Sequence, residues 1–409
     1  MSTPIRLLHF ADVHVGMENY GRLDVDSGTS SRVRDFLNRM DEVIEYGLDN
    51  KADIAIFAGD AFKTRDPNPT HQREFATRLK RLADNMPLLL LVGNHDLPGM
   101  ASKASSVDIF KALDVPNVIV GNKPESRVVD TRSGPVFLAW LPYPMRNRLL
   151  AHDQNRGKSL HDLDLALQTA VVTIINDLAG KAMKHDMPRI LSSHLSVSEA
   201  KLGSERSVML GKDVTISKSV LDDQVWDYVA LGHIHKHQDV NLGSYPGIVY
   251  SGSLERIDFG EEKENKGFCW VELEREKSSW KFVRVNARPF LTIRVDVRDH
   301  DDPTAAVLSN ISTHDIKGIV VRLMIKIKSQ NIRMLRDKDI DDSLSDAHSY
   351  SIAKDVEYEA RTRIGGVAAE TLSAEELLEH YLVDKGYTPE RIRTLLSAAN
   401  NIFHTDTKS

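Results

Sequence analysis

Residues 5–14 read IRLLHFADVH, an apolar run that ends beside an aspartate and a histidine. The run from Ile5 to Phe10 predicts a buried strand, and Asp12 and His14 follow its end. Strand-like runs over residues 53–58 and 88–92 alternate with helical patterns over residues 33–50 and 70–85. This β-α-β-α-β order predicts an α/β fold in which a sheet is layered with helices.

Metal-binding residue types follow five of the predicted strands. In open α/β sheets, binding sites form in the crevice beyond the carboxyl ends of the strands. Two further strands, predicted over residues 189–193 and 227–231, also end beside such residues. The five motifs are Asp12-Val13-His14, Gly59-Asp60, Gly93-Asn94-His95-Asp96, Ser193-His194 and Gly232-His233-Ile234-His235.

Each motif alone also has an ordinary structural interpretation. An aspartate after a strand is usually a helix N-cap, and Gly-Asn and Gly-Asp are common turn dipeptides. A lone histidine more often lies at the surface or in a hydrogen bond than on a metal. The ordered set of five is hard to reach by chance, so we interpret it as one site. Side chains at i and i+2 of an extended segment point to one side, and we expect this of Asp12 and His14.

The composition of the set indicates two divalent ions. Aspartate, asparagine and histidine ligands without cysteine suit manganese better than a structural zinc. A carboxylate can bridge two metals, and ions about 3.5–4 Å apart can hold a phosphodiester and activate a water. His95 is left over for proton donation or charge stabilisation, and Asp96 would orient or cap. The predicted ligands are Asp12, His14, Asp60, Asn94, His194, His233 and His235.

The order of these motifs resembles that of the calcineurin-like metallophosphoesterases. The resemblance implies a layered β-sandwich core flanked by helices. It also implies that Asp60 bridges the two metals and that His95 is catalytic. One metal would be held by Asp12, His14, Asp60 and His235, and the other by Asp60, Asn94, His194 and His233.

Later segments resemble the SbcD-type nucleases of double-strand-break repair. These are residues 250–261 (YSGSLERIDFGE), Lys266-Gly267-Phe268 and Arg288-Pro289-Phe290. The resemblance runs from Ile5 to about Phe403 and implies a manganese-dependent exonuclease and endonuclease acting on DNA ends and hairpins. It also implies an SbcC-type coiled-coil ATPase as partner, bound by C-terminal helices, and a homodimer. In archaeal and eukaryotic relatives a histidine lies where this chain has Lys63, so the balance of the two nuclease activities stays open.

The patterns predict four segments. A metallophosphoesterase domain over residues 1–287 is followed by a small α+β capping domain over 288–352, whose residues 291–298 and 321–328 alternate like strands. A polar linker over 353–370 precedes a helical hairpin over 371–405. Ser373 to Glu376 form a capping box, and Thr388-Pro389 starts the second helix. From the residues alone, packing on its own protein and binding to a partner are equally good interpretations of the hairpin.

The homodimer would use helices at residues 69–82 and 101–113, with Phe75 and Phe110 as contacts. A place in the core of the same chain is as good an interpretation of either phenylalanine. Arg22, Arg32 and Arg34, in an insertion over residues 17–34, are candidates to flank DNA, although a surface loop is the default.

Composition excludes several classes of protein. A net charge of -6 excludes a purely electrostatic nucleic-acid coat, and the single Cys269 excludes a disulfide framework and a thiolate metal cluster. With no signal-peptide pattern and no apolar stretch near the length of a membrane span, we expect a cytoplasmic protein. Two other functions stay open: a nucleotide or cyclic-nucleotide phosphodiesterase, and a DNA-end-binding subunit that cleaves little.

Overall fold

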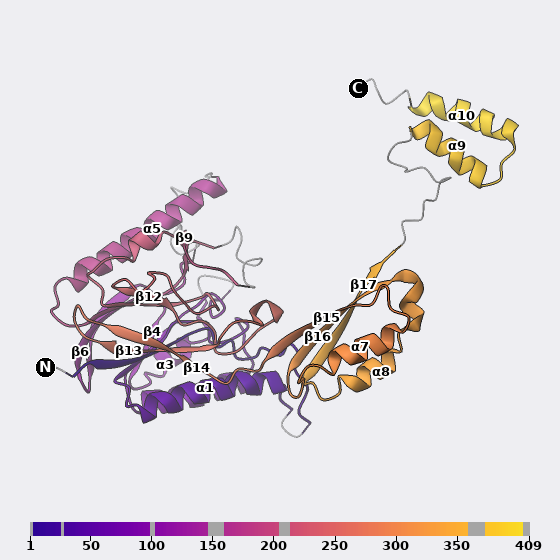
Figure 1. The fold of residues 1–409 in the computed structure, drawn as a ribbon. Coiled ribbons are helices and arrows are strands. Elements are labelled where there is room, and N and C mark those ends of the chain that lie inside the picture. The colour runs from indigo at the N-terminus through magenta and orange to yellow at the C-terminus, as the bar shows by residue number, and fades with distance from the viewer. Residues whose placement is uncertain are drawn as a thin grey trace. The chain divides into compact units, whose positions relative to one another are not determined.

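Two six-stranded sheets form the main body of the chain, and Figure 1 shows α1 and α5 on opposite sides of them. The computed structural model describes residues 3–25, 28–98, 103–145, 159–203, 213–358 and 373–403. The first sheet has the order β14-β13-β1-β2-β3-β4. Its strands β1 to β4 are parallel, β13 is antiparallel to β1, and β14 is antiparallel to β13. The strands are β1 (Ile5–Phe10), β2 (Ile54–Phe57), β3 (Leu88–Leu91), β4 (Val118–Gly121), β13 (Gly267–Leu273) and β14 (Ser279–Arg284).

The second sheet has the order β11-β12-β10-β7-β6-β5. Its four central strands are parallel, and the edge strands β5 and β11 are antiparallel to their neighbours. The sequence analysis missed β5, because this edge strand is largely exposed and has no apolar run. The strands are β5 (Glu125–Thr131), β6 (Gly134–Leu141), β7 (Arg189–His194), β10 (Tyr228–Gly232), β11 (Gln238–Asp239) and β12 (Gly247–Tyr250).

Three buried clusters hold the layers together. Ile56 and Leu91 of the first sheet meet Leu138 and Ala230 of the second in a cluster between the sheets. A second cluster joins the first sheet to α1 (Ser31–Asp49), α2 (Pro69–Ala83) and α3 (Asp108–Ala112). A third joins the second sheet to α5 (Leu160–Ala182). The core is therefore a layered β-sandwich flanked by helices, as expected.

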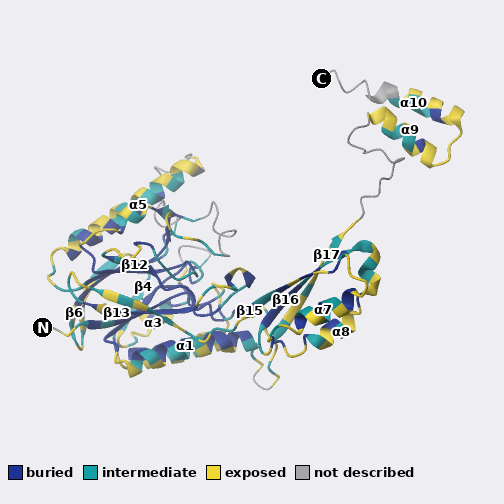
Figure 2. Ribbon diagram, in the orientation of Figure 1, coloured by how far each residue is buried: buried dark blue, intermediate teal, exposed yellow. Residues whose placement is uncertain are grey.

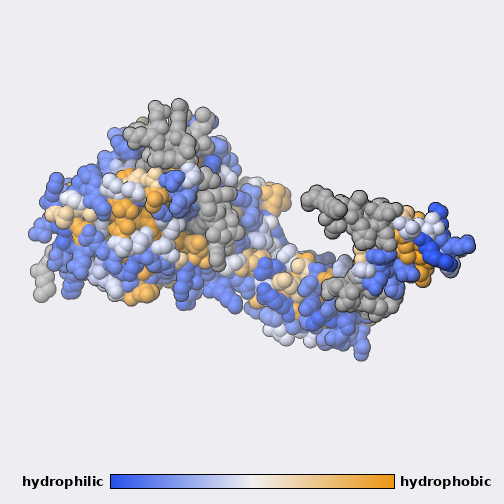
Figure 3. All heavy atoms as spheres, turned by 90° about the horizontal axis from the view of Figure 1, so that it is seen from above, coloured by the Kyte–Doolittle hydropathy of each residue, from blue (hydrophilic) through white to orange (hydrophobic). Residues whose placement is uncertain are grey.

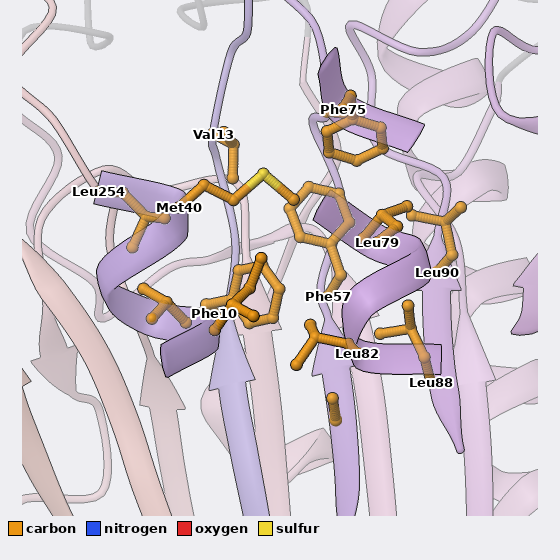
Figure 4. Close-up of a cluster of buried hydrophobic side chains, with 14 of the residues drawn as sticks. Phe10, Val13, Met40, Phe57, Phe75, Leu79, Leu82, Leu88, Leu90 and Leu254 are labelled. Atoms are coloured by element: carbon orange, nitrogen blue, oxygen red, sulfur yellow. The ribbon is translucent and has the colours of Figure 1, made fainter. Parts of the chain in front are cut away.

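The helix-facing side of the first sheet is packed with large apolar side chains. Figure 4 shows Phe10 and Phe57 of β1 and β2 among Met40 of α1 and Leu79 of α2. Such fully buried side chains each stabilise the fold by about 1.5–3 kcal/mol relative to exposure. In Figure 2 the strands of this body are mostly dark blue, whereas α1 and α5 alternate between buried and exposed colours. This alternation is typical of amphipathic helices that cover a sheet.

The helix α5 corrects one expectation. Its residues His161–Ala182 are long and apolar enough to cross a membrane by length and composition, with a mean hydropathy of 1.2. The expectation that no apolar stretch approaches that length was therefore wrong. The stripe formed by Leu167, Val171, Ile175 and Leu178 is buried against the second sheet. Packing of that stripe accounts for part of the apolar character of the helix, since 28% of the apolar window is buried.

Shorter elements complete the main body. They lie in the connections that follow β7, β10 and β12, close to the predicted motifs. They are β8 (Ser196–Val197), β9 (Thr215–Ile216), η2 (Lys218–Val220) and η3 (Phe259–Glu261).

The chain divides into two compact units, the first of which runs through Ile293 and includes residues 314–323 and 344–351. The division runs through a three-stranded sheet of order β15-β16-β17. On the predicted alternating strand 321–328, the apolar residues of one face are buried: Val321, Leu323, Ile325 and Ile327. The sequence analysis missed β17 because it shows no regular alternation, and residues 353–357 of the predicted linker belong to this strand. The elements are β15 (Phe290–Asp296), α7 (Pro303–Ile311), β16 (Val320–Lys328), η4 (Ser329–Met334), α8 (Asp337–Ser343) and β17 (Ser349–Glu357).

The last described segment is a pair of helices, α9 (Ala374–Asp384) and α10 (Pro389–Phe403), that contact each other. Ser373 and Glu376 form the predicted capping box. Gly386 follows α9 with a φ of 75°, a value that glycine adopts readily. Most of the predicted linker and residues 371–372 and 404–405 of the predicted hairpin lie outside the described residues.

Candidate metal centre

The eight predicted site residues come together at the carboxyl ends of β1, β2, β3, β7 and β10. The first group consists of Asp12, His14 and His235, whose ligand atoms lie within 4.8 Å of one another. The Nε2 atoms of His14 and His235 are 3.0 Å apart. Two nitrogens that bind one ion at about 2.1 Å and at a right angle are separated by roughly 3 Å. The two imidazoles are therefore spaced as ligands of one metal.

The second group lies on the other side of Asp60. The ligand atoms of Asp60, His194 and His233 lie within 4.8 Å of one another. Asn94 joins this group, because its Oδ1 is 3.0 Å from Nε2 of His194 and 2.9 Å from Nδ1 of His233. An amide oxygen, a carboxylate and two imidazoles suit a hard or borderline divalent cation.

Asp60 lies between the two groups. Its Oδ2 is 3.8 Å from Nε2 of His14 and 3.5 Å from Nε2 of His194. One carboxylate oxygen thus faces a histidine of each group. A carboxylate has enough lone pairs to bind two ions at once, so this position suits a bridging ligand.

The charges in the cluster are balanced between Asp60 and His194. Burial would raise the pKa of Asp60, but the facing histidines, His194 first, lower it well below its ordinary range. Burial would lower the pKa of His194, but Asp60 outweighs burial and raises this pKa to about 9. Each group therefore favours the charged form of the other. A divalent cation bound there would take the place of a proton on the imidazole.

Asp96 supports the loop that carries Asp60, as the sequence analysis expected. Its carboxylate accepts hydrogen bonds from the backbone N–H groups of Asp60 (3.0 Å), Ala61 (3.0 Å) and Gly93 (2.9 Å). Burial and the charge of Asp60 raise the pKa of Asp96 to about 6. Asp96 therefore ties the loop after β2 to the loop after β3.

His95 lies beside both groups without being enclosed by them. Its backbone N–H donates to Oδ1 of Asp60 (2.9 Å), and its Nδ1 is 2.8 Å from the carbonyl oxygen of Lys63. An Nδ1–H donated to that carbonyl leaves Nε2 as the atom that can exchange a proton. The ligand atoms of His95, His14 and Asp60 also lie within 4.8 Å of one another, so the distances alone would also allow a ligand role.

The backbone of the site is strained at four predicted ligands. Asp12, His14, Asp60 and His233 have φ values of 53°, 49°, 62° and 99°. Non-glycine residues adopt such values rarely, at a cost of order 1–3 kcal/mol each, and they cluster at functional sites. The expectation that Asp12 and His14 lie on an extended segment was wrong. Bends after β1, rather than strand alternation, bring the two side chains together.

At two glycines of the motifs, side-chain atoms of other site residues come so close that a Cβ atom would not fit. A Cβ atom on Gly93 would lie 2.1 Å from Oδ1 of Asp60. Gly59 has a φ of 103°, and a Cβ there would lie 2.4 Å from Nδ1 of His194. These glycines are therefore more than parts of turns, because they admit the carboxylate and the imidazole to the site.

Two carboxylates that the sequence analysis did not single out as site residues contact site histidines. Oδ2 of Asp213 is 2.7 Å from Nε2 of His233, and Oε1 of Glu261 is 2.9 Å from Nδ1 of His235. Neither lies in one of the five motifs. Glu261 stands in the quoted segment 250–261, and that likeness was the available signal for it.

The residues present fit a pair of divalent ions. Six of the seven predicted ligands supply carboxylate or imidazole groups, and Asn94 supplies an amide oxygen. Asp12, His14, Asp60 and His194 are almost fully buried, whereas Asn94, His95 and His235 are partly exposed. The side of the cluster bearing Asn94 and His95 is thus accessible to a substrate.

Comparison with known families agrees with this geometry. Residues 5–237, which include all five motifs, match the family model described as calcineurin-like phosphoesterase. The chain belongs to this family. As a calcineurin-like phosphoesterase, it is a metal-dependent hydrolase of phosphoester bonds.

Curated relatives of this calcineurin-like phosphoesterase include a nuclease subunit and DNA double-strand break repair proteins. The SbcD component of the SbcCD nuclease of Bacillus subtilis (strain 168) is 28% identical over 292 residues, which are 69% of this chain and 70% of that protein. DNA double-strand break repair protein Mre11 of Methanosarcina mazei is 24% identical, over 81% of this chain and 47% of that longer protein. Mre11 of Methanococcus maripaludis is 24% identical over 93% of this chain and 91% of that protein.

Proposed function

We propose that this phosphoesterase is a manganese-dependent DNA nuclease and the nuclease subunit of an SbcCD-type repair complex. It would act on DNA ends and hairpins as an exonuclease and an endonuclease. The position of Asp60 between two groups of ligand atoms supports the two-metal chemistry. The names of the relatives, a nuclease subunit and DNA double-strand break repair proteins, support DNA as the substrate.

The ligands divide between the two ions. Asp60 would be shared by both. Two bound divalent ions would activate a water and stabilise the charge that develops on the phosphate. Asp12, His14, Asp60 and His235 would hold the first ion, and Asp60, Asn94, His194 and His233 the second.

His95 would act on the leaving oxygen of the phosphodiester. The Lys63 carbonyl orients its ring by accepting Nδ1–H, so Nε2 would take up a proton to form the imidazolium and would then donate that proton to the leaving oxygen. This backbone contact would be available to any residue at position 63. The lysine therefore leaves the orientation of His95 intact, while its side chain replaces the histidine of archaeal and eukaryotic relatives.

The partners follow from the same proposal. The pair α9 and α10 would bind the coiled coil of an SbcC-type ATPase, and the chain would form a homodimer in the cytoplasm. Phe75 and Phe110 are buried within this chain, which favours their intramolecular role. Ile109 and Leu113, on and just after α3, are 52% and 69% exposed, and they are the better candidates for a dimer contact.

The arginines of the 17–34 insertion make poor DNA contacts. Arg32 is fully buried, pairs with Asp35 and lies over the ring of Phe290. Arg34 pairs with Asp24, and Arg22 donates to the carbonyl oxygen of Ala347. These interactions favour a structural role over contact with phosphate.

The deciding experiment is cleavage of linear and hairpin duplex DNA with manganese by the wild type, Asp60→Ala and His95→Asn. We expect Asp60→Ala to lose both metal binding and cleavage. We expect His95→Asn to keep metal binding and lose about 10²- to 10⁴-fold in rate, the usual contribution of acid–base catalysis. Asp177→Ala, which removes an exposed carboxylate on α5, is the matched control.

Three outcomes would contradict the proposal. Equal activity in the wild type and both site variants would refute the mechanism. Hydrolysis of nucleotides but not of DNA would favour the small-molecule phosphodiesterase. Binding of DNA ends by wild type without cleavage would favour a DNA-end-binding subunit. Loss of manganese affinity in His95→Asn would, separately, reassign His95 as a ligand.

A further inference from the structure

His235 is held from outside the metal centre by a buried carboxylate. Its Nδ1 is 2.9 Å from Oε1 of Glu261, and its Nε2 is 3.0 Å from Nε2 of His14. The two nitrogens of the ring therefore face two different environments. One faces the metal ligands, and the other faces a carboxylate that lies outside the ligand set.

Glu261 is itself held rigidly. Its side chain is 0% exposed, and its second oxygen accepts from Nζ of Lys266 (2.8 Å) and from the backbone N–H of Ile257 (3.0 Å). Lys266 is equally buried, and its Nζ also donates to Oε2 of Glu264 (2.9 Å) and to the carbonyl oxygen of His235 (3.2 Å). The lysine thus contacts both the carboxylate and the backbone of the histidine that the carboxylate orients.

A buried ion pair of this kind is weak evidence for stability. Removing two charges from water is costly, and apolar residues of similar volume often stabilise a protein as well or better. The two oxygens of Glu261 face different partners, Nδ1 of His235 and Nζ of Lys266. A carboxylate beside Nδ1 of His235 accepts a hydrogen bond from this nitrogen and so favours the tautomer protonated at Nδ1.

We propose that Glu261 is a positioning residue for the metal centre, and that Lys266 holds its carboxylate in place. Glu261 accepts the Nδ1–H of His235, which leaves the lone pair of Nε2 available for the ion that Asp12 and His14 would also hold. A carboxylate behind a metal-binding histidine fixes the ring and raises its basicity. This inference rests on the proposed two-metal function.

Glu264 provides an internal comparison. It also pairs with Lys266, but its hydrogen bond goes to the lysine and not to His235. If the ion pairs of Lys266 mattered only for packing, loss of Glu261 or of Glu264 would have a similar effect on the metal centre. If Glu261 orients His235, loss of Glu261 alone would weaken metal binding.

The test is a titration of the metal-free full-length chain with Mn²⁺, in which electron paramagnetic resonance measures free Mn²⁺. Glu261→Leu alone would leave Lys266 buried beside one fewer carboxylate and could unfold the chain. The double variant Glu261→Leu/Lys266→Met removes both charges with little change in volume and avoids this. Glu264→Leu is the matched control, and thermal melts of the metal-free proteins check that each variant folds.

We expect wild type to bind two Mn²⁺ ions and the double variant to bind one of them about 10- to 100-fold more weakly. Glu264→Leu should bind both within twofold of wild type. Unchanged affinity in the folded double variant would overturn the inference and leave the proposed function standing. An equal loss in Glu264→Leu would also overturn it. If wild type bound no Mn²⁺, the proposed function would fail together with this inference.

Discussion

The metal centre and the C-terminal helix pair differ in two ways. The residues of the metal centre are far apart in the sequence and mostly buried, whereas the helix pair is formed by neighbouring segments and keeps apolar residues exposed. Asp12 and His233 are 221 positions apart, yet both are buried and the carboxylate of Asp12 accepts the backbone N–H of His233. The helices α9 and α10 are neighbours in sequence, and Tyr381 and Val383 of α9 remain 50% and 59% exposed. Figure 3 shows hydrophobic surface on the part of the chain that carries them. The groups that meet in the first region come from distant parts of the chain and are buried, whereas the second region keeps apolar side chains exposed, which fits the proposed binding of a partner.

The largest effect is expected from Gly93→Ala. The added Cβ would lie 2.1 Å from Oδ1 of Asp60 and would displace the shared carboxylate. We expect DNA cleavage to fall by roughly 10³-fold, as when a transition-state contact is removed. Gly180→Ala on α5, where a Cβ meets nothing within 4 Å, is the control. Equal activity of the two variants would show that the centre tolerates backbone movement.

The next effect is expected on stability. Asp35 accepts hydrogen bonds from Arg32 (2.7 Å) and from two nitrogens of Arg288 (both 2.6 Å). Asp35→Asn would leave two largely buried guanidinium groups short of a counter-charge, so we expect a loss of about 3 kcal/mol in urea unfolding. Asp41→Asn removes a more exposed partner of Arg78 and Arg81 and should cost under about 1 kcal/mol. Similar losses in both variants would contradict this contrast.

A smaller effect is expected in the helix pair. Leu395→Asp replaces a half-buried leucine of α10 by a charge, so affinity for the coiled-coil fragment of an SbcC-type ATPase should fall about 30-fold. Cleavage of DNA by the isolated chain should stay within twofold of wild type. Thr394→Asp, on an exposed position of α10, should leave both quantities unchanged. Loss of cleavage in Leu395→Asp would mean that the two regions are coupled.

The smallest effect concerns pH. Burial would raise the pKa of Asp35, but Arg288 and Arg32 outweigh it and the folded pKa lies below the ordinary value. The unfolded carboxyl, with a pKa of about 3.9, takes up a proton at higher pH than the folded one. The stabilisation by Asp35 is therefore complete above that value and is lost as pH falls through the folded pKa. Urea unfolding of wild type and Asp35→Asn should differ less at pH 3 than at pH 7, and a constant difference would contradict this.

Much of the core was predictable because its central strands are buried on both faces. Runs such as residues 88–92 are continuously apolar, and the buried strand β3 lies there. The edge strands β5 and β17 were missed, because exposed strands need no apolar run. The five motifs were predictable because metal chemistry restricts the residue types that can follow a strand.

The contacts that orient the site histidines and favour one tautomer of each ring could not be predicted from the residues alone. The carbonyl of Lys63 orients His95 through a backbone atom, which every residue type possesses. Asp213 and Glu261 reach their histidines from loops and short elements whose paths depend on packing. A carboxylate in such a segment looks the same in sequence whether it faces solvent or an imidazole.

The sequence by itself determined the ligand types, their order at successive strand ends, and the alternation of strands and helices. These properties are local, since residue type and periodicity are written into the chain. Only the tertiary structure decided that one oxygen of Asp60 faces both histidine groups and that bends at Asp12 and His14 align them. Those facts depend on two sheets packing so that residues more than two hundred positions apart meet within hydrogen-bonding distance.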